Sequence, residues 1–181
     1  ERILLYGAPK SGKSRLACAI PWNSFWGERA IYVAADPGSA SLRSIPPGDR
    51  VHITVVEPRP DTGKYDPLHE AVQVATHKWD ASLLIWDTIT ATAHDLLAAY
   101  AKLSNYASNQ ISYGKPGTPE HHVQPVMGDY GATQNSIMHL VNLLFDQPLH
   151  IIVVCHEDWA EPKNANECIG GPATVGSAAI R

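Results

Sequence analysis

The fold is decided by one stretch of the sequence, Gly7-Ala8-Pro9-Lys10-Ser11-Gly12-Lys13-Ser14. An apolar segment of strand type, Arg2-Ile3-Leu4-Leu5-Tyr6, precedes it. Apolar residues at helical spacing follow it, up to Pro21. A strand, a glycine-bearing loop and the start of a helix, in this order, are what a phosphate-binding loop (P-loop) requires.

The residue types of this stretch suit a polyphosphate. Its glycines allow consecutive backbone N–H groups to turn toward one point, and a helix that opens at Gly12 adds unpaired amides. Lys13 is placed to reach the β and γ phosphates, and the Ser14 hydroxyl to hold magnesium. We therefore predict a nucleotide site formed by Gly7, Ala8, Pro9, Lys10, Ser11, Gly12, Lys13, Ser14 and Arg15.

Composition predicts one ordinary globular domain spanning residues 1–181. The sequence is 44% apolar and 18% charged, and its net charge of -4 gives no bulk basic character for nucleic acid. Its three cysteines form no Cys-x-x-Cys motif, which favours a reduced, cytoplasmic protein with buried or idle thiols. No apolar run approaches ~18 residues, so we expect no membrane association. The chain starts without methionine, and we expect it to be trimmed.

Buried strands and helices alternate along the chain. Continuous apolar runs predict strands at residues 30–35, 51–56, 83–86 and 151–155. Helical spacing occurs from Leu16 to Ile20, Leu68 to Ala75, Leu96 to Leu103 and Ile137 to Leu144. This alternation predicts an α/β fold with a mainly parallel sheet covered by helices on both faces. Such sheets bind ligands beyond the carboxyl ends of their strands, where Asp36, Glu57, Asp87 and His156 lie.

One of these strands has the form of a Walker B element. Four apolar residues, Leu83 to Trp86, bury the strand and deliver Asp87 beside a magnesium ion held by the P-loop. Strands often end in aspartate, so this pattern is weak alone. Together with the loop around Lys13 it indicates a P-loop nucleotide triphosphatase.

With these two elements in place, the chain resembles the RecA-like recombinase ATPases over nearly its whole length. Four segments carry the resemblance: Pro60-Asp61-Thr62-Gly63, Met127 to Gly131 with the helix after it, Ile151 to His156, and Glu157 to Pro172. They are similar to a motif before the Walker B strand, the end of the first DNA-binding loop, a sensor strand and the second DNA-binding loop. The His-Glu strand end and the short Asp36-Pro37-Gly38 look most like phage-encoded members that assist single-strand annealing and recombination.

The resemblance implies a specific mechanism. ATP would lie along Gly7 to Ser14, magnesium would be held by Ser14 and Asp87, and His156 would sense the γ phosphate. The water-activating acid would be Asp36, where glutamate is usual, with Glu57 and Glu157 as further candidates. Nucleotides lie between protomers in this family, so a homo-oligomer, a ring or a filament, is also implied.

Asp36, Glu57 and His156 also have ordinary structural interpretations. Asp36 before Pro37 is also typical of a turn, and Glu57 before Pro58 of a solvated loop. His156 could be a satisfied histidine at a strand end. The adjacent His121 and His122 lack the further ligands that a metal site needs.

Two polar loops, residues 104–128 and 157–176, are the candidate contacts with single-stranded DNA. Stacking and backbone neutralisation could come from Tyr106, Tyr113, Lys115, His121, His122, Trp159, Lys163, Asn164 and Asn166. These cations are sparse, which predicts weak binding by a monomer. A filament multiplies a weak site by the number of its subunits.

Two other functions share the same loop. A small-molecule or nucleotide kinase usually carries an arginine-bearing lid, and residues 104–128 contain no arginine. A nucleotide-binding scaffold with little turnover is compatible with the uncertain catalytic base. The leading hypothesis is a DNA-stimulated ATPase.

Overall fold

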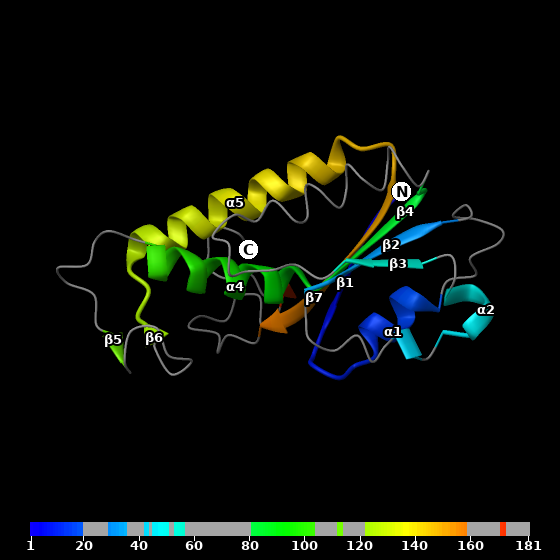
Figure 1. The fold of residues 1–181 in the computed structure, drawn as a ribbon, viewed down its shortest axis with the longest axis horizontal. Coiled ribbons are helices and arrows are strands. Elements are labelled where there is room, and N and C mark those ends of the chain that lie inside the picture. Colours follow the sequence, from blue (N-terminus) through cyan, green and yellow to red (C-terminus); the bar gives the residue numbers. More distant parts are fainter. Residues whose placement is uncertain are drawn as a thin grey trace, which may run out of the picture.

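The protein is an α/β domain built on one parallel sheet (Figure 1). A computed structural model describes residues 1–19, 29–35, 42–43, 45–50, 53–56, 81–103, 112–113, 122–158 and 171–172. Across the sheet the strand order is β1-β7-β4-β2-β3. These strands are β1 (Arg2–Gly7), β2 (Ala30–Ala34), β3 (Ile53–Val56), β4 (Leu83–Asp87) and β7 (His150–Asp158). All four neighbouring pairs are parallel, which confirms the predicted fold class.

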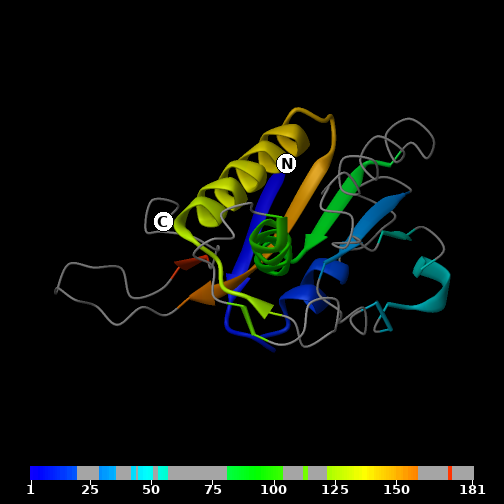
Figure 2. The same cartoon turned by 60° about the vertical axis from the view of Figure 1, so that its left-hand side comes forward.

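Helices lie on both faces of this sheet. The described helices are α1 (Lys13–Cys18), α2 (Pro47–Arg50), α4 (Ile89–Leu103) and α5 (Met127–Phe145). The long helices α4 and α5 pack together against one face, and α1 packs against the other. Figure 2 shows α4 nearly end-on between α5 and α1, with the strands running past it. None of the helices in the described ranges is long and apolar enough to cross a bilayer.

Alternation along the strands divides the interior into two cores. Side chains of successive strand residues point to opposite faces of the sheet, so each central strand contributes side chains to both cores. The core under α4 and α5 contains Ile31, Val33, Leu84, Trp86, Ile151 and Val153. The core under α1 contains Ala30, Tyr32, Leu83, Ile85, Ile152 and Val154. Leu83, Ile85 and Asp87 are every second residue of β4, so their side chains point to the same face of the sheet. The Asp87 side chain therefore lies on the α1 face.

The first strand is less buried than its sequence suggests. Residues of β1 alternate between exposed and partly buried, because β1 is the last strand on its side of the described sheet. Leu16, one of the apolar residues at helical spacing in the first helix, is 62% exposed. Ala17 and Cys18 form the buried face instead, since they are the residues of α1 that meet the sheet.

The start of α5 differs from the expectation. We placed residues 127–131 at the end of a loop, but they form the first turns of the helix. The buried Asp129 explains this start, because its Oδ2 accepts a hydrogen bond of 2.8 Å from the Val126 N–H and its charge suits the first turn. The apolar face predicted farther along is confirmed by the burial of Ile137, Leu140 and Leu144.

Both predicted DNA-facing loops carry short antiparallel pairs. Within residues 104–128, β5 (Ser112–Tyr113) pairs with β6 (His122–Val123). Within residues 157–176, the end of β7 pairs with β8 (Gly171–Pro172), so Glu157 opposes Pro172. The rest of both loops and the helix predicted from Leu68 to Ala75 lie outside the described residues.

Candidate nucleotide-binding site

The P-loop connects β1 to α1 as the sequence predicted. Gly12 immediately precedes α1 and has a φ of 89°, and Lys10 has a φ of 64°. These are left-handed conformations, which glycine adopts at little cost and lysine at a higher one. At Gly7, an added Cβ would lie 3.3 Å from Ser11 Oγ, so the loop folds tightly over the end of the strand.

Lys13 lies across this loop. Its ammonium donates hydrogen bonds to the Gly7 carbonyl at 2.8 Å and the Ala8 carbonyl at 2.7 Å, with Ser11 Oγ at 3.4 Å. A lysine ammonium has three protons to donate, and here they go to the loop itself. The cation is therefore held over the loop, where a bound phosphate can replace these neutral acceptors.

Ser14 follows Lys13 in the first turn of α1 and is partly buried. Cys18 is four residues after Ser14, on the same helix face, and is 2% exposed. Burial, and to a smaller extent the charge of Asp87, raises the pKa of the Cys18 thiol to about 12. Asp87 is thus close enough to act on α1 electrostatically. The burial of Cys18 and Cys155 confirms the prediction of buried thiols at these two positions.

Asp87 is the buried acid of the site. It is 3% exposed, and its Oδ2 accepts a hydrogen bond from the Tyr32 hydroxyl. Its Oδ1 is buried and has no hydrogen-bond partner within the described part of the chain. Buried carboxylate oxygens are normally paired, so this oxygen points to a missing ligand. Carboxylate and hydroxyl oxygens are what Mg²⁺ prefers, and Asp87 with Ser14 offers both.

The chain leaves Asp87 through a tightly bonded turn. The peptide bond to Thr88 is cis, and the Thr88 hydroxyl accepts a hydrogen bond of 3.0 Å from the Ala91 N–H, which caps α4. Behind this turn, Trp86 Nε1 donates to Thr92 Oγ1 at 2.8 Å. These bonds fix the start of α4 directly after the Walker B acid.

His156 stands beside the P-loop. In the sheet it is the register partner of Gly7, on the strand between β1 and β4. Its backbone N–H donates a hydrogen bond of 3.0 Å to Thr90 Oγ1, and this hydroxyl lies 3.4 Å from Cys155 Sγ. Strand β7 is therefore tied to the first turn of α4, three residues after Asp87.

Of the three predicted bases, the structure describes only Glu157. This residue is partly buried in β7, next to His156. Asp36 and Glu57 lie outside the described residues; Asp36 comes two residues after the end of β2, and Glu57 directly follows β3. Also outside are seven of the residues proposed to contact DNA: Tyr106, Lys115, His121, Trp159, Lys163, Asn164 and Asn166. Tyr113 and His122 lie in β5 and β6.

Comparison with known protein families shows to which family the chain belongs. Residues 1–170 match a family described as AAA domain. The chain belongs to the AAA domain family. This membership agrees with the P-loop and with ATP and Mg²⁺ as the ligands of such a site. No match was found among curated protein sequences.

Two solved structures show distant similarity to this AAA domain. One is a RadB recombinase, with 16% identity and a TM-score of 0.46, covering 92% of this chain and 66% of that one. The other is YqhD of E. coli K-12, a structure of unknown function, with 12% identity and a TM-score of 0.28. That match covers 84% of this chain and 43% of YqhD.

Sequence reasoning missed Tyr32 and Thr90. Tyr32 lies in a strand that was predicted only as buried. Its hydroxyl could have indicated a polar neighbour, because a buried phenol needs a hydrogen-bond partner. Thr90 is the second residue of α4 and carries no comparable signal. Its partner, His156 N–H, is 66 residues away in the sequence.

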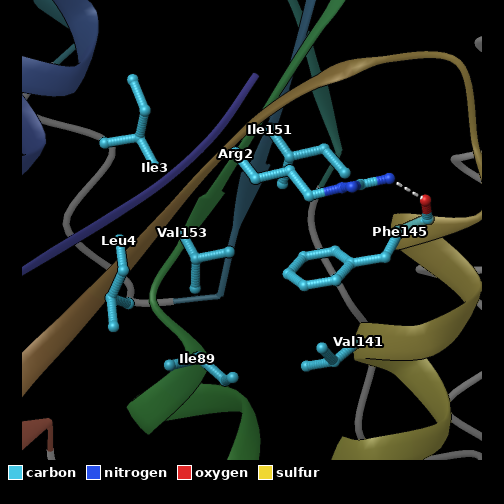
Figure 3. A pocket seen from close by; sticks show the side chains of 8 residues that line it. All are labelled: Arg2, Ile3, Leu4, Ile89, Val141, Phe145, Ile151 and Val153. Carbon is cyan, nitrogen blue, oxygen red and sulfur yellow. Dashed lines mark hydrogen bonds between the residues drawn. The ribbon is translucent and has the colours of Figure 1, made fainter.

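A separate cavity lies on the other face of the sheet (Figure 3). It has a volume of about 400 Å³ and an apolar lining. The Arg2 guanidinium lies 4.9 Å from the centre of the Phe145 ring and donates to the Phe145 carbonyl. Because this cavity opens between β1, β7, α4 and α5, it is not part of the P-loop site.

Proposed function

We propose that this AAA domain binds ATP with Mg²⁺ on its P-loop and hydrolyses it to ADP and phosphate. The observation that carries the proposal is the buried, unpartnered Oδ1 of Asp87, which lies close to the helix that follows the loop. A buried carboxylate oxygen is tolerated when binding supplies its partner. Mg²⁺ bound with ATP is the ligand whose chemistry fits that oxygen and the Ser14 hydroxyl together.

The chain's own residues divide the work. Lys13 exchanges its contacts with the Gly7 and Ala8 carbonyls for phosphate oxygens. Ser14 and Asp87 would hold Mg²⁺, which would neutralise charge on the phosphates. His156, beside Gly7, senses the terminal phosphate and passes its presence to the segment after β7.

The catalytic base is assigned first to Asp36. Thr88 follows Asp87, so the Walker B strand itself delivers no second acid. Asp36 comes two residues after β2, which neighbours β4 in the sheet. Glu57 follows β3, one strand farther out, and Glu157 follows His156. Both remain alternatives to Asp36.

We further propose that ATP turnover serves single-stranded DNA within a homo-oligomer, in phage-type recombination, annealing or repair. The support is the resemblance to RecA-like recombinases, together with two short β-pairs that anchor the loops expected to face DNA. The β7–β8 pair begins at Glu157, next to the proposed sensor, so a change at His156 has a direct path into that loop.

Steady-state ATP turnover, with and without single-stranded DNA at low salt, tests the proposal. Lys13→Ala removes the phosphate-binding cation, and we expect kcat to fall about 100-fold or more. Lys102→Ala is the matched control, because it removes the same charge from an exposed position near the end of α4. Equal turnover in Lys13→Ala and wild type contradicts ATP hydrolysis at this loop. Turnover indifferent to DNA contradicts the DNA role.

A nucleotide-binding scaffold is the second candidate. It is favoured by Thr88, since no acid follows the Walker B aspartate. Asp36→Asn separates the two functions when ATP binding and turnover are measured side by side. An ATPase with Asp36 as its base loses turnover and keeps binding. A scaffold binds ATP while wild type and Lys13→Ala show the same negligible turnover.

A further inference from the structure

The Walker B acid is held by one phenol. The Tyr32 hydroxyl donates to Asp87 Oδ2, and both residues are buried, with exposures of 1% and 3%. The other oxygen, Oδ1, has no partner in the described ranges of the chain. The carboxylate is therefore asymmetric: one oxygen is committed to the protein, and the other is left available.

The sheet explains how Tyr32 reaches this acid. Tyr32 is the register partner of Ile85, and Asp87 is two residues beyond Ile85 on the neighbouring strand. Residues two apart on a strand share a face, so the phenol and the carboxylate lie diagonally on the α1 face. A long side chain spans such a diagonal. Tyr32 is packed there in the core that also holds Cys18 and Val154.

We propose that Tyr32 is a positioning residue for the metal site, an inference that rests on the proposed function. By holding Oδ2, the Tyr32 hydroxyl fixes the rotation of the Asp87 carboxylate and keeps Oδ1 as the oxygen that serves Mg²⁺. Tyr32 itself touches neither nucleotide nor metal. Its contribution is to remove the alternative orientations that a buried carboxylate could adopt before the ligand arrives.

A purely structural role is the competing explanation. In that case the hydroxyl satisfies a buried acid and contributes to stability, and its loss affects folding without a specific effect on magnesium. The two explanations differ in the Mg²⁺ dependence of nucleotide binding. Partners of metal-ligating groups typically change metal affinity 10–100-fold when they are removed.

The test compares Tyr32→Phe with Tyr100→Phe. Tyr100 also loses one hydroxyl that forms a hydrogen bond, at 2.6 Å from Ser136 Oγ between α4 and α5, away from the P-loop. Binding of a fluorescent ATP analogue is measured in EDTA and across a Mg²⁺ titration, with thermal unfolding of each protein. In Tyr32→Phe we expect binding in EDTA within twofold of wild type and about a tenfold higher Mg²⁺ concentration for half-maximal enhancement. Tyr100→Phe keeps the wild-type Mg²⁺ dependence.

The possible failures are distinct. A Tyr32→Phe protein with a lowered melting temperature and an unchanged Mg²⁺ requirement overturns the positioning role and leaves the proposed function intact. A wild-type protein that binds no ATP analogue overturns both. Should Tyr32→Phe fail to fold, a crystal structure of the wild-type protein with Mg²⁺ and a nonhydrolysable ATP analogue decides. Tyr32 bonded to Oδ2 with Oδ1 toward the metal supports the proposal, and a released Tyr32 refutes it.

Discussion

At the residue scale, we expect glycine-to-alanine substitutions at Gly12 and Gly131 to change the stability of the protein in opposite directions. Gly12→Ala places a side chain on a backbone with a φ of 89°, which costs about 1–2 kcal/mol even though no atom lies within 4 Å of the added Cβ. Gly131→Ala lies inside α5 with equally open space, and we expect a gain of about 0.5–1 kcal/mol. Urea unfolding measures both. Equal effects of the two substitutions contradict the P-loop conformation.

The buried thiol of Cys18 gives a second residue-scale prediction. Its pKa is raised from 9.0 to about 12, which lowers the thiolate fraction near neutral pH about a thousandfold. We therefore expect no alkylation of Cys18 by iodoacetamide in the native protein at pH 8 and full alkylation in urea. Mass spectrometry of tryptic peptides measures this. Rapid labelling of the native protein at Cys18 argues against the packing of α1 on the sheet.

At the scale of elements, Thr90 links α4 to β7. Thr90→Val removes the oxygen that accepts the His156 N–H at 3.0 Å, and we expect a loss of about 1–3 kcal/mol in stability. Thr90→Ser retains the hydroxyl and serves as the control, with a smaller loss from the missing methyl. Urea unfolding is again the measurement. If the Val and Ser variants are equally stable, the hydrogen bond contributes nothing to joining these elements.

The sequence predicted elements well where one local signal dominated. These elements were the strand–loop–helix order of the P-loop, the buried strands and the Walker B strand. Each is marked by a pattern among residues that are neighbours in the sequence. The start of α5 was hidden by Gly128 and Gly131, because glycines lower helix propensity while the cap at Asp129 restores it.

Contacts between distant residues could not be predicted in the same way. The bond from Tyr32 to Asp87 depends on strand order and register, which are tertiary properties that no local pattern records. The exposure of Leu16 likewise depends on which side of α1 meets the sheet. The elements that carry the motifs were therefore predictable, and the contacts that reach them from other strands were not.

At the scale of the whole molecule, assembly is expected to control DNA binding. With a net charge of -4 and few cations in the candidate loops, one subunit neutralises little DNA backbone. We expect cooperative, sigmoidal binding to labelled oligo-dT that requires a nonhydrolysable ATP analogue and weakens steeply as salt rises. Fluorescence polarisation measures binding, and mass photometry measures assembly. Hyperbolic binding by monomers contradicts this expectation.

The central claim concerns the whole site: one ATP is bound per chain, on the loop from Gly7 to Ser14. Calorimetric titration of ATP with Mg²⁺ into the wild type, Lys13→Ala and Lys102→Ala tests it most directly. The account predicts one bound nucleotide per chain, wild-type affinity in Lys102→Ala and at least about tenfold weaker binding in Lys13→Ala. Full affinity in Lys13→Ala, or no binding by the wild type, contradicts it.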